Sequence, residues 1–456
     1  MIRSRVVSPV EVVEAHLRRV DDINPLLNAI VTLAPDVLDQ ARIAEAHLTS
    51  GKEVGPLHGV PITVKDTIDT QGLRTTSGSV LRANHVPDRD ATVVARLRAA
   101  GAIILGKTNT PEMAIPYESD NPVFGRTNNP HRFELTPGGS SGGEAAAIAA
   151  GLSPAGLGSD LSGSIRVPAH FCGIVGLKPT TGLVPMDGHT PSADGLLSIA
   201  ACIGPMARTV ADLELILKII ADAAHLETSD VSTSFQQGSL AQRGLRVAWY
   251  ADDGVAPVTE ETRRAIIAAA NALSDAGLKV SEENPPGISE GARLWMELFS
   301  RAANEQLRAL YRDREDAAGP LVSRLLDSFE SATDLQDRIS EAESAAAAVL
   351  ERERLREALL RWMKATPLIL APVGSTPAFE HGARRVTVKG ESISVFRAFS
   401  YSQTFNVFGL PSVVVPAGCS VDGLPIGVQI VGRPFDESTV LAAAAIVEES
   451  LGGFRN

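Results

Sequence analysis

Apolar positions in the first fifty residues recur with the spacing of helices. Residues 8–50 place apolar side chains every three or four positions, as two amphipathic helices would. Ser8, a following proline and Glu11 form a helix-start signal, because both side chains can satisfy free backbone N–H groups of the first turn. Asn24 and Pro25 interrupt the pattern, so we expect one helix to end there and a second to follow.

Downstream, short apolar runs alternate with helical patterns. Residues 57–66 predict a strand, and residues 102–106 predict a short buried strand. Between them, residues 89–101 predict a helix that ends at Gly101, because glycine accepts the left-handed backbone of a helix end. The order of helix, glycine and strand recurs at 144–152 and 260–280, and further strands are predicted at 245–249 and 368–371.

This alternation indicates an α/β fold whose central sheet is covered by helices on both faces. The order of the strands does not follow from the pattern. Residues 288–365 differ from the rest, being rich in alanine, glutamate, arginine and leucine. Within them, residues 338–364 have a long helical period with many charge pairs four positions apart. On the pattern alone, this segment is a pair of solvated helices packed on the core.

Composition excludes several classes of function. The 456 residues are 44% hydrophobic and 21% charged, which is typical of a soluble globular protein. A net charge of −12 argues against a general nucleic-acid binder. No apolar run reaches about 18 residues and no leader pattern is found, so we expect no membrane span and a cytoplasmic location. The three cysteines have the surroundings of reduced core thiols, and no metal-ligand spacing occurs.

Two serines in glycine-rich segments and one lysine are the strongest candidates for chemistry. Ser140 stands in PGGSSGGE (137–144), Ser164 stands in GSDLSGSIRVP (158–168), and Lys65 ends the apolar run VPITVK. A serine nucleophile needs a base, and a buried lysine that loses its proton can be that base. Ser140 can then relay a proton between Lys65 and Ser164. The alternative to a catalytic role is a structural one, in which Ser140 is a helix N-cap and Lys65 is a surface lysine.

The turn before Ser164 predicts an oxyanion site. Small residues let the backbone of this turn approach a substrate, and successive N–H groups can converge on one oxygen. The N–H groups of Leu161, Ser162, Gly163 and Ser164 are the candidates. A phosphate-binding loop does not fit, since neither Gly-x-x-x-x-Gly-Lys-Ser/Thr nor Gly-x-Gly-x-x-Gly opening a helix is present.

These segments together resemble the amidase signature family. Further matching motifs lie at 59–66, 106–109, 171–180, 406–411 and 423–429, so that most of the chain outside about 285–365 is covered. The resemblance implies one large domain over 1–456 around a mixed, twisted sheet. Within it we expect N-terminal helices (1–55), a catalytic core (56–210) and a helical cap-like insertion (288–365) over the substrate channel.

The resemblance also implies an activity, the hydrolysis of carboxylic amides by a Ser–cis-Ser–Lys triad. Lys65 is then the base, Ser140 is the serine with a cis peptide bond, and Ser164 is the nucleophile. Ser141 is expected to make a supporting hydrogen bond. The family usually has glycine where this chain has Ser162. No cofactor and no metal are implied, and His58, His170 and His189 are expected in the core or at its rim.

The branch of the family bears on the substrate. Amidotransferase A subunits carry an aspartate seven residues before the Asn at position 406, whereas this chain has Phe399 there. The segments around 117–125 and Glu144 are instead similar to the fatty-acid-amide-hydrolase-like branch, and Ala114 matches a substrate contact. We therefore expect a stand-alone amidase, monomeric or homodimeric, for small apolar or aryl amides, anilides or carbamates (a urethanase). The alternative is an A-type subunit that hydrolyses glutamine to deliver ammonia.

Overall fold

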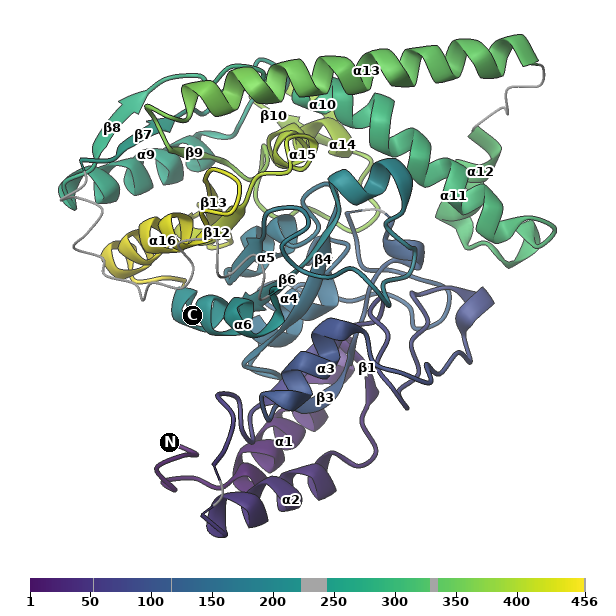
Figure 1. The fold of residues 1–456 in the computed structure, drawn as a ribbon, viewed down its shortest axis with the longest axis vertical. Helices are drawn as coiled ribbons and strands as arrows, with labels where there is room; N and C mark the ends of the chain where they lie inside the picture. Colours follow the sequence, from purple (N-terminus) through teal and green to yellow (C-terminus); the bar gives the residue numbers. More distant parts are fainter. Residues whose placement is uncertain (52, 116, 223–243, 329–334, 455–456) are drawn as a thin grey trace.

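A mixed sheet runs through the molecule with helices packed against it (Figure 1). The computed structural model describes residues 1–51, 53–115, 117–222, 244–328 and 335–454. Among these residues the sheet has eleven strands, in the order β1-β3-β2-β4-β6-β5-β12-β13-β9-β7-β8, and β10 and β11 form a hairpin of their own. The strands are β1 (Ile30–Leu33), β2 (Pro61–Lys65), β3 (Ile103–Thr108), β4 (Ala155–Asp160), β5 (Val175–Lys178), β6 (Cys202–Ala207), β7 (Arg246–Trp249), β8 (Lys279–Glu282), β9 (Leu368–Pro372), β10 (Arg385–Val388), β11 (Glu391–Ser394), β12 (Ser412–Cys419) and β13 (Pro425–Val431).

Helices cover both faces of this sheet, as the sequence predicts. Successive side chains of a strand point to opposite faces. In β12, Val413 packs in one core cluster with Ala265, whereas its neighbour Val414 packs in another with Ala169. The helices that carry these partners therefore lie on opposite faces. The helices of the body are α1 (Pro9–Leu27), α2 (Val37–Thr49), α3 (Thr92–Ala99), α4 (Gly142–Ala149), α5 (Arg166–Cys172), α6 (Val210–Ile220), α9 (Glu260–Asp275), α14 (Val395–Ala398), α15 (Ser400–Val407) and α16 (Glu437–Leu451).

The N-terminal segment differs in one detail from the expectation. Ser8 and Glu11 form the expected reciprocal cap, with hydrogen bonds of 2.8 and 3.1 Å. Pro25, however, does not end the first helix; α1 runs through it to Leu27. The Asn24 side chain bonds the backbone of the chain just after the helix, which steers it into the unexpected strand β1.

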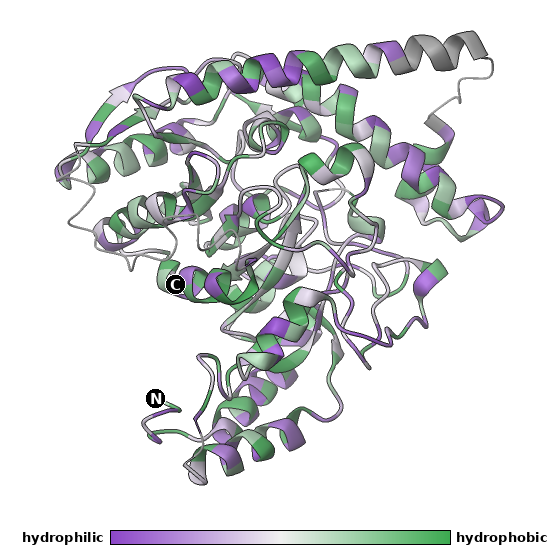
Figure 2. Cartoon of the chain, viewed as in Figure 1, coloured by the Kyte–Doolittle hydropathy of each residue, from purple (hydrophilic) through white to green (hydrophobic). Residues whose placement is uncertain are grey.

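The described residues of the segment 288–365, which are 288–328 and 335–365, are largely helical and lie beside the sheet (Figure 1). The segment is anchored to the body through the buried carboxylate of Glu112, which accepts from the Tyr311 hydroxyl at 2.6 Å and from the Gly319 N–H at 2.8 Å. Hydrophilic positions are spread along the described part of its last helix (Figure 2). Its helices are α10 (Gly291–Trp295), α11 (Arg301–Tyr311), α12 (Pro320–Ser328) and α13 (Leu335–Trp362), with a π-helical turn at Met296–Ser300.

Two further expectations concern a membrane-spanning helix and the three cysteines. No helix in the described ranges is both long and apolar enough for a bilayer crossing. Cys172 and Cys202 are buried free thiols, as expected, but Cys419 is exposed because β12 leaves the core near its end. The prediction of a core position was therefore wrong for Cys419.

Candidate active site

The predicted base and both predicted serines come from chain segments that meet at one end of β2 and β4. These strands are parallel neighbours, with Val64 opposite Leu157, so their carboxyl ends lie side by side. Lys65 is the last residue of β2, and Ser159 is the last but one of β4. The turn with Ser164 follows β4 directly. Carboxyl ends of parallel strands are where α/β sheets commonly place reacting groups.

Lys65 is completely buried and contacts two serine hydroxyls. Its Nζ lies 2.7 Å from the Oγ of Ser140 and 2.9 Å from the Oγ of Ser159. Burial lowers the pKa of Lys65 from 10.5 to about 7, although the carboxylates of Asp160 and Glu144 oppose the change. A sizeable fraction of this amine is therefore neutral at neutral pH, which a general base requires.

Ser140 lies in the tight segment before α4. The Gly139–Ser140 peptide bond is cis, as the family resemblance implied. A side chain at Gly139 would come within 2.3 Å of the Glu118 carbonyl oxygen, so the segment accepts only glycine there. Ser140 is not the helix cap; that position belongs to Ser141. The Ser141 hydroxyl instead bridges the backbone of Ser159 at 3.2 and 3.3 Å, which is the supporting role expected of it.

Ser164 lies next to this segment. Its carbonyl oxygen accepts a hydrogen bond of 3.1 Å from the N–H of Ser141. Its hydroxyl makes no hydrogen bond within the described ranges, and a small part of the residue is exposed. Gly163 has a φ of +108°, and a Cβ there would meet the Ser402 side chain at 2.8 Å. Glycine is therefore required at position 163, and the tight turn that it allows presents the Ser164 side chain.

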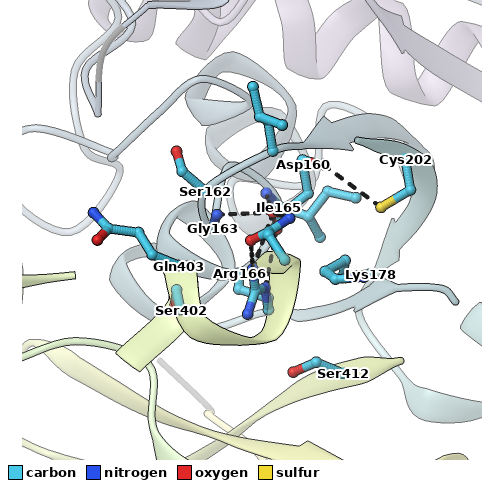
Figure 3. Close-up of polar contacts among 12 residues, drawn as sticks. Asp160, Ser162, Gly163, Ile165, Arg166, Lys178, Cys202, Ser402, Gln403 and Ser412 are labelled. Carbon is cyan, nitrogen blue, oxygen red and sulfur yellow. Dashed lines mark hydrogen bonds and ion pairs between the residues drawn. The ribbon is translucent and has the colours of Figure 1, made fainter. Parts of the chain in front are cut away.

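The carboxylate of Asp160 holds this turn from within (Figure 3). It accepts the N–H groups of Gly163 at 2.7 Å and Ile165 at 3.1 Å, and a two-pronged ion pair from Arg166. Burial alone would raise the pKa of Asp160, but Arg166 and the hydrogen bonds more than offset burial and hold that pKa well below its usual range. The Asn406 amide also bonds the carboxylate at 3.0 Å.

This network changes one detail of the predicted oxyanion site. The N–H of Gly163 is committed to Asp160, so in this structure it is not free for a substrate oxygen. The N–H groups of Leu161, Ser162 and Ser164 make no hydrogen bond to any other described residue. The hydroxyl of Ser162 points away from the Asp160 network (Figure 3). Three of the four predicted donors are thus unengaged.

Two aromatic side chains hold the other side of the turn. The indole N–H of Trp295, from α10, donates to the Leu161 carbonyl at 2.8 Å. The Tyr117 hydroxyl donates to the Ser162 carbonyl at 3.0 Å. The C=O and N–H of one peptide group point in opposite directions, so fixing the Leu161 carbonyl also fixes the N–H of Ser162. Neither contact was predicted, because no local pattern links these aromatic residues to the turn.

The two predicted substrate contacts have different surroundings. Ala114 ends a 3-10 turn at Glu112–Ala114, is partly exposed and has a φ of +61°, which is uncommon without glycine. Its role stays a prediction. Phe399 is completely buried, with its ring centroid 4.5 Å from that of Tyr117. Its role in substrate binding also stays a prediction.

Sequence reasoning assigned no role beside Lys65 to three groups that lie near it. Ser159 contacts Lys65 directly, and His189 contacts Ser159 at 2.9 Å. Glu144 is fully buried and accepts from Thr63 and from Thr108, the latter at 2.7 Å. Burial raises the pKa of Glu144 to about 7, against these hydrogen bonds. Ser159 stood in the quoted Ser164 segment, but nothing in its type marks a lysine partner.

The remaining features of the described ranges offer no second reactive centre. No group of three or more histidine, cysteine, aspartate or glutamate side chains there is arranged to hold a metal ion. A hollow of about 1380 Å³ is bordered by α1, α4, α6, α16 and the segment near Phe454, and it contains none of the predicted site residues.

Comparisons with known proteins match nearly the whole chain. A family model described as Amidase matches residues 11–441. The A-type subunit of the glutamyl-tRNA(Gln) amidotransferase of Carboxydothermus hydrogenoformans is 34% identical, and the match covers 98% of this chain and 95% of the relative. A crystal structure of an amidase has a TM-score of 0.86 at 27% identity, covering 99% of this chain and 98% of its own. A bacterial aryl acylamidase of the amidase signature family has a TM-score of 0.84 at 26% identity, covering 98% and 94%.

Proposed function

The chain belongs to the amidase signature family of hydrolases that act on C–N bonds, and we propose that it cleaves small apolar or aryl amides through an acyl-enzyme on Ser164. One observation carries this proposal: the buried amine of Lys65 lies 2.7 Å from Ser140, and its pKa is lowered to about 7. Lysine in that state accepts a proton at neutral pH, so no histidine is needed.

The reaction begins with the transfer of two protons. The neutral amine of Lys65 takes the proton of Ser140, which takes the proton of Ser164, and the Ser164 oxygen attacks the amide carbonyl. The N–H groups of Ser162 and Ser164 stabilise the oxyanion, with that of Leu161 as a further donor. The C–N bond then breaks as Ser140 returns a proton to the leaving amine. Water attacks the acyl-enzyme by the same proton route and releases the carboxylic acid.

Aromatic rings beside the oxyanion turn support the substrate class. Tyr117 and Trp295 both bond this turn, and Phe396 packs 5.0 Å from Trp295 and 6.2 Å from Tyr117 between ring centroids. An apolar or aryl group placed against such rings gains about 25 cal/mol for each Å² buried. Phe399 stands where a glutamine-using relative has an acid, so the charged head of glutamine would lack its partner. Carbamates fit the same chemistry, since they too present a carbonyl group bonded to nitrogen.

The test combines a covalent probe with a serine variant. A fluorophosphonate should label the wild-type protein on Ser164, as located by peptide mass spectrometry. Ser164→Ala should lose labelling and at least about a thousandfold in kcat, with an unchanged circular dichroism spectrum. Ser198→Ala is the matched control, since Ser198 is exposed. Labelling at another residue, or a folded Ser164→Ala variant with a tenth of wild-type activity, overturns the assignment.

The amidotransferase relatives favour one alternative, a glutamine-hydrolysing component of an amidotransferase. A panel of aryl amides, fatty amides, anilides, carbamates and glutamine separates the two. We expect hydrolysis of apolar members with little glutaminase activity. If glutamine is cleaved faster than every apolar member, the amidotransferase interpretation replaces this proposal. Size-exclusion chromatography then shows whether the chain stays monomeric or homodimeric, as proposed, or needs partner subunits.

A further inference from the structure

A second layer of side chains lies behind Lys65, and it includes His189. The Nε2 of His189 lies 2.9 Å from the Oγ of Ser159, whose other contact is the Nζ of Lys65 at 2.9 Å. The Nδ1 of His189 lies 2.7 Å from the carbonyl oxygen of Pro191. Four groups therefore form one line of hydrogen bonds that ends at the base.

The direction of each bond in this line follows from the chemistry of its ends. A carbonyl oxygen only accepts, so the proton of the neutral imidazole is on Nδ1 and faces Pro191. The Nε2 of His189 is then an acceptor, and the Ser159 hydroxyl donates its single proton to it. Burial and the nearby amine of Lys65 both lower the pKa of His189, which keeps the ring neutral at physiological pH. With its proton committed, Ser159 can only accept from Lys65.

The ring is held in place by backbone contacts to the segment just after β2. The N–H of Thr190 donates to the Thr67 carbonyl at 2.8 Å, and the N–H of Asp69 donates to the Gly188 carbonyl at 2.8 Å. His189 itself is paired with Ile68 in an isolated β-bridge. The segment that carries His189 is therefore fixed to the residues that immediately follow Lys65.

A neutral lysine amine has two N–H groups and one lone pair. If Ser159 were free to donate, the lone pair could face either serine, and only one choice activates Ser140. We propose that His189 is a positioning residue for Lys65, because it fixes the Ser159 hydroxyl as an acceptor and so leaves the amine's lone pair for Ser140. This inference rests on the proposed function, in which Lys65 is the base.

The charged groups around Lys65 do not set the direction of its lone pair. Glu144 and Asp160 face the amine from α4 and β4, and Lys107 lies near Glu144. These groups change how readily Lys65 binds a proton, but none of them bonds the Lys65 Nζ. The direction of the lone pair depends on the two hydroxyls alone, so it can be tested at a pH where the amine is neutral.

The test measures the rate at which a fluorophosphonate labels Ser164, which needs no known substrate. At pH 9, about two units above the pKa of Lys65, we expect His189→Ala to label about tenfold more slowly than wild type. His189→Gln should stay within about threefold, because its amide oxygen can accept from Ser159. Ser159→Ala should stay closer to wild type than His189→Ala, because the amine then has no second hydroxyl for its lone pair to face. The double variant should label like Ser159→Ala, since His189 acts only through the Ser159 hydroxyl. His47→Ala, an exposed histidine, is the matched control.

Each outcome decides the question. If His189→Ala labels like His47→Ala at pH 9, or if the double variant labels as slowly as His189→Ala, the positioning role is wrong while Ser164 labelling still supports the hydrolase. If the loss is confined to pH below 7, His189 acts on protonation and the inference also fails. If His189→Ala does not fold, His189→Phe takes its place, because a phenyl ring fills the site but cannot accept from Ser159. If the probe labels a residue other than Ser164, the proposed function falls and this inference with it.

Discussion

Replacing Lys65 by methionine should remove activity and yet make the protein more stable at neutral pH. The folded state lowers the pKa of this amine from 10.5 to about 7. Between these values the unfolded chain binds one proton more than the folded chain, so wild-type stability rises with pH. The gap of about 3.5 units corresponds to roughly 4 kcal/mol of unfolding free energy at pH 7.

Methionine fills the site without this cost, but it leaves the two hydroxyls of Ser140 and Ser159 without their lysine partner. Each lost hydrogen bond costs about 1 kcal/mol. The net expectation is that Lys65→Met is more stable than wild type by about 2 kcal/mol at pH 7. The difference should fall by about 1.4 kcal/mol per pH unit, change sign near pH 9 and level off above pH 10.5.

Urea unfolding at pH 7, 8 and 9, followed by circular dichroism and tryptophan fluorescence, measures this difference. Lys218→Met is the control, since Lys218 is an exposed partner of Glu214 on the surface of α6 and its loss should change stability by less than about 0.5 kcal/mol at every pH. A stability difference between wild type and Lys65→Met that is constant from pH 7 to 9 would refute the burial argument.

Three other predictions follow from the site. Activity should rise from pH 6 to 8 as Lys65 loses its proton. Glu144→Gln should shift the midpoint of the kcat/KM profile to lower pH, because the Glu144 carboxylate raises the pKa of Lys65. A midpoint that stays or rises contradicts this. Trp295→Phe removes the bond to the Leu161 carbonyl while keeping an aromatic ring, so the N–H of Ser162 is held less firmly and kcat should fall about tenfold with little change in KM. A loss in KM alone argues against this. Dialysis against EDTA should leave activity unchanged; a loss restored by added metal overturns the metal-free mechanism.

Features encoded within a few residues of one another were predictable from the sequence. The reciprocal cap at Ser8, the strand that ends in Lys65 and the tight turn before Ser164 all depend on local residue types. The spacing of apolar positions alone distinguished helices from strands over most of the chain. The positions of Lys65 and Ser140 could be joined only through family resemblance, because a separation of 75 positions sets no geometry by itself.

Features that depend on distant partners were not predictable. Strand β1 exists because β3 offers an antiparallel edge, with Ile30 opposite Thr108, and not because of its own pattern. Pro25 removes one hydrogen bond of α1, but it is exposed and stands in the last turn, so water can bond the freed carbonyl and little of the helix follows it. The engagement of the Gly163 N–H by Asp160 depends on a side-chain orientation that the spacing of these residues leaves open.

The indole contact between Trp295 and the Leu161 carbonyl has a consequence for how members of this family diverge. Trp295 lies in the segment 288–365, outside the motifs that mark the family, and the same segment reaches the Ser192 carbonyl through Gln306 at 2.7 Å. We therefore expect that exchanging this segment with that of a relative also exchanges a side chain that holds the turn before Ser164. If the segment also lines the substrate channel, as proposed from the sequence, such an exchange should change kcat and selectivity together. A directed-evolution library meant to change selectivity alone should therefore hold Trp295 and Gln306 constant.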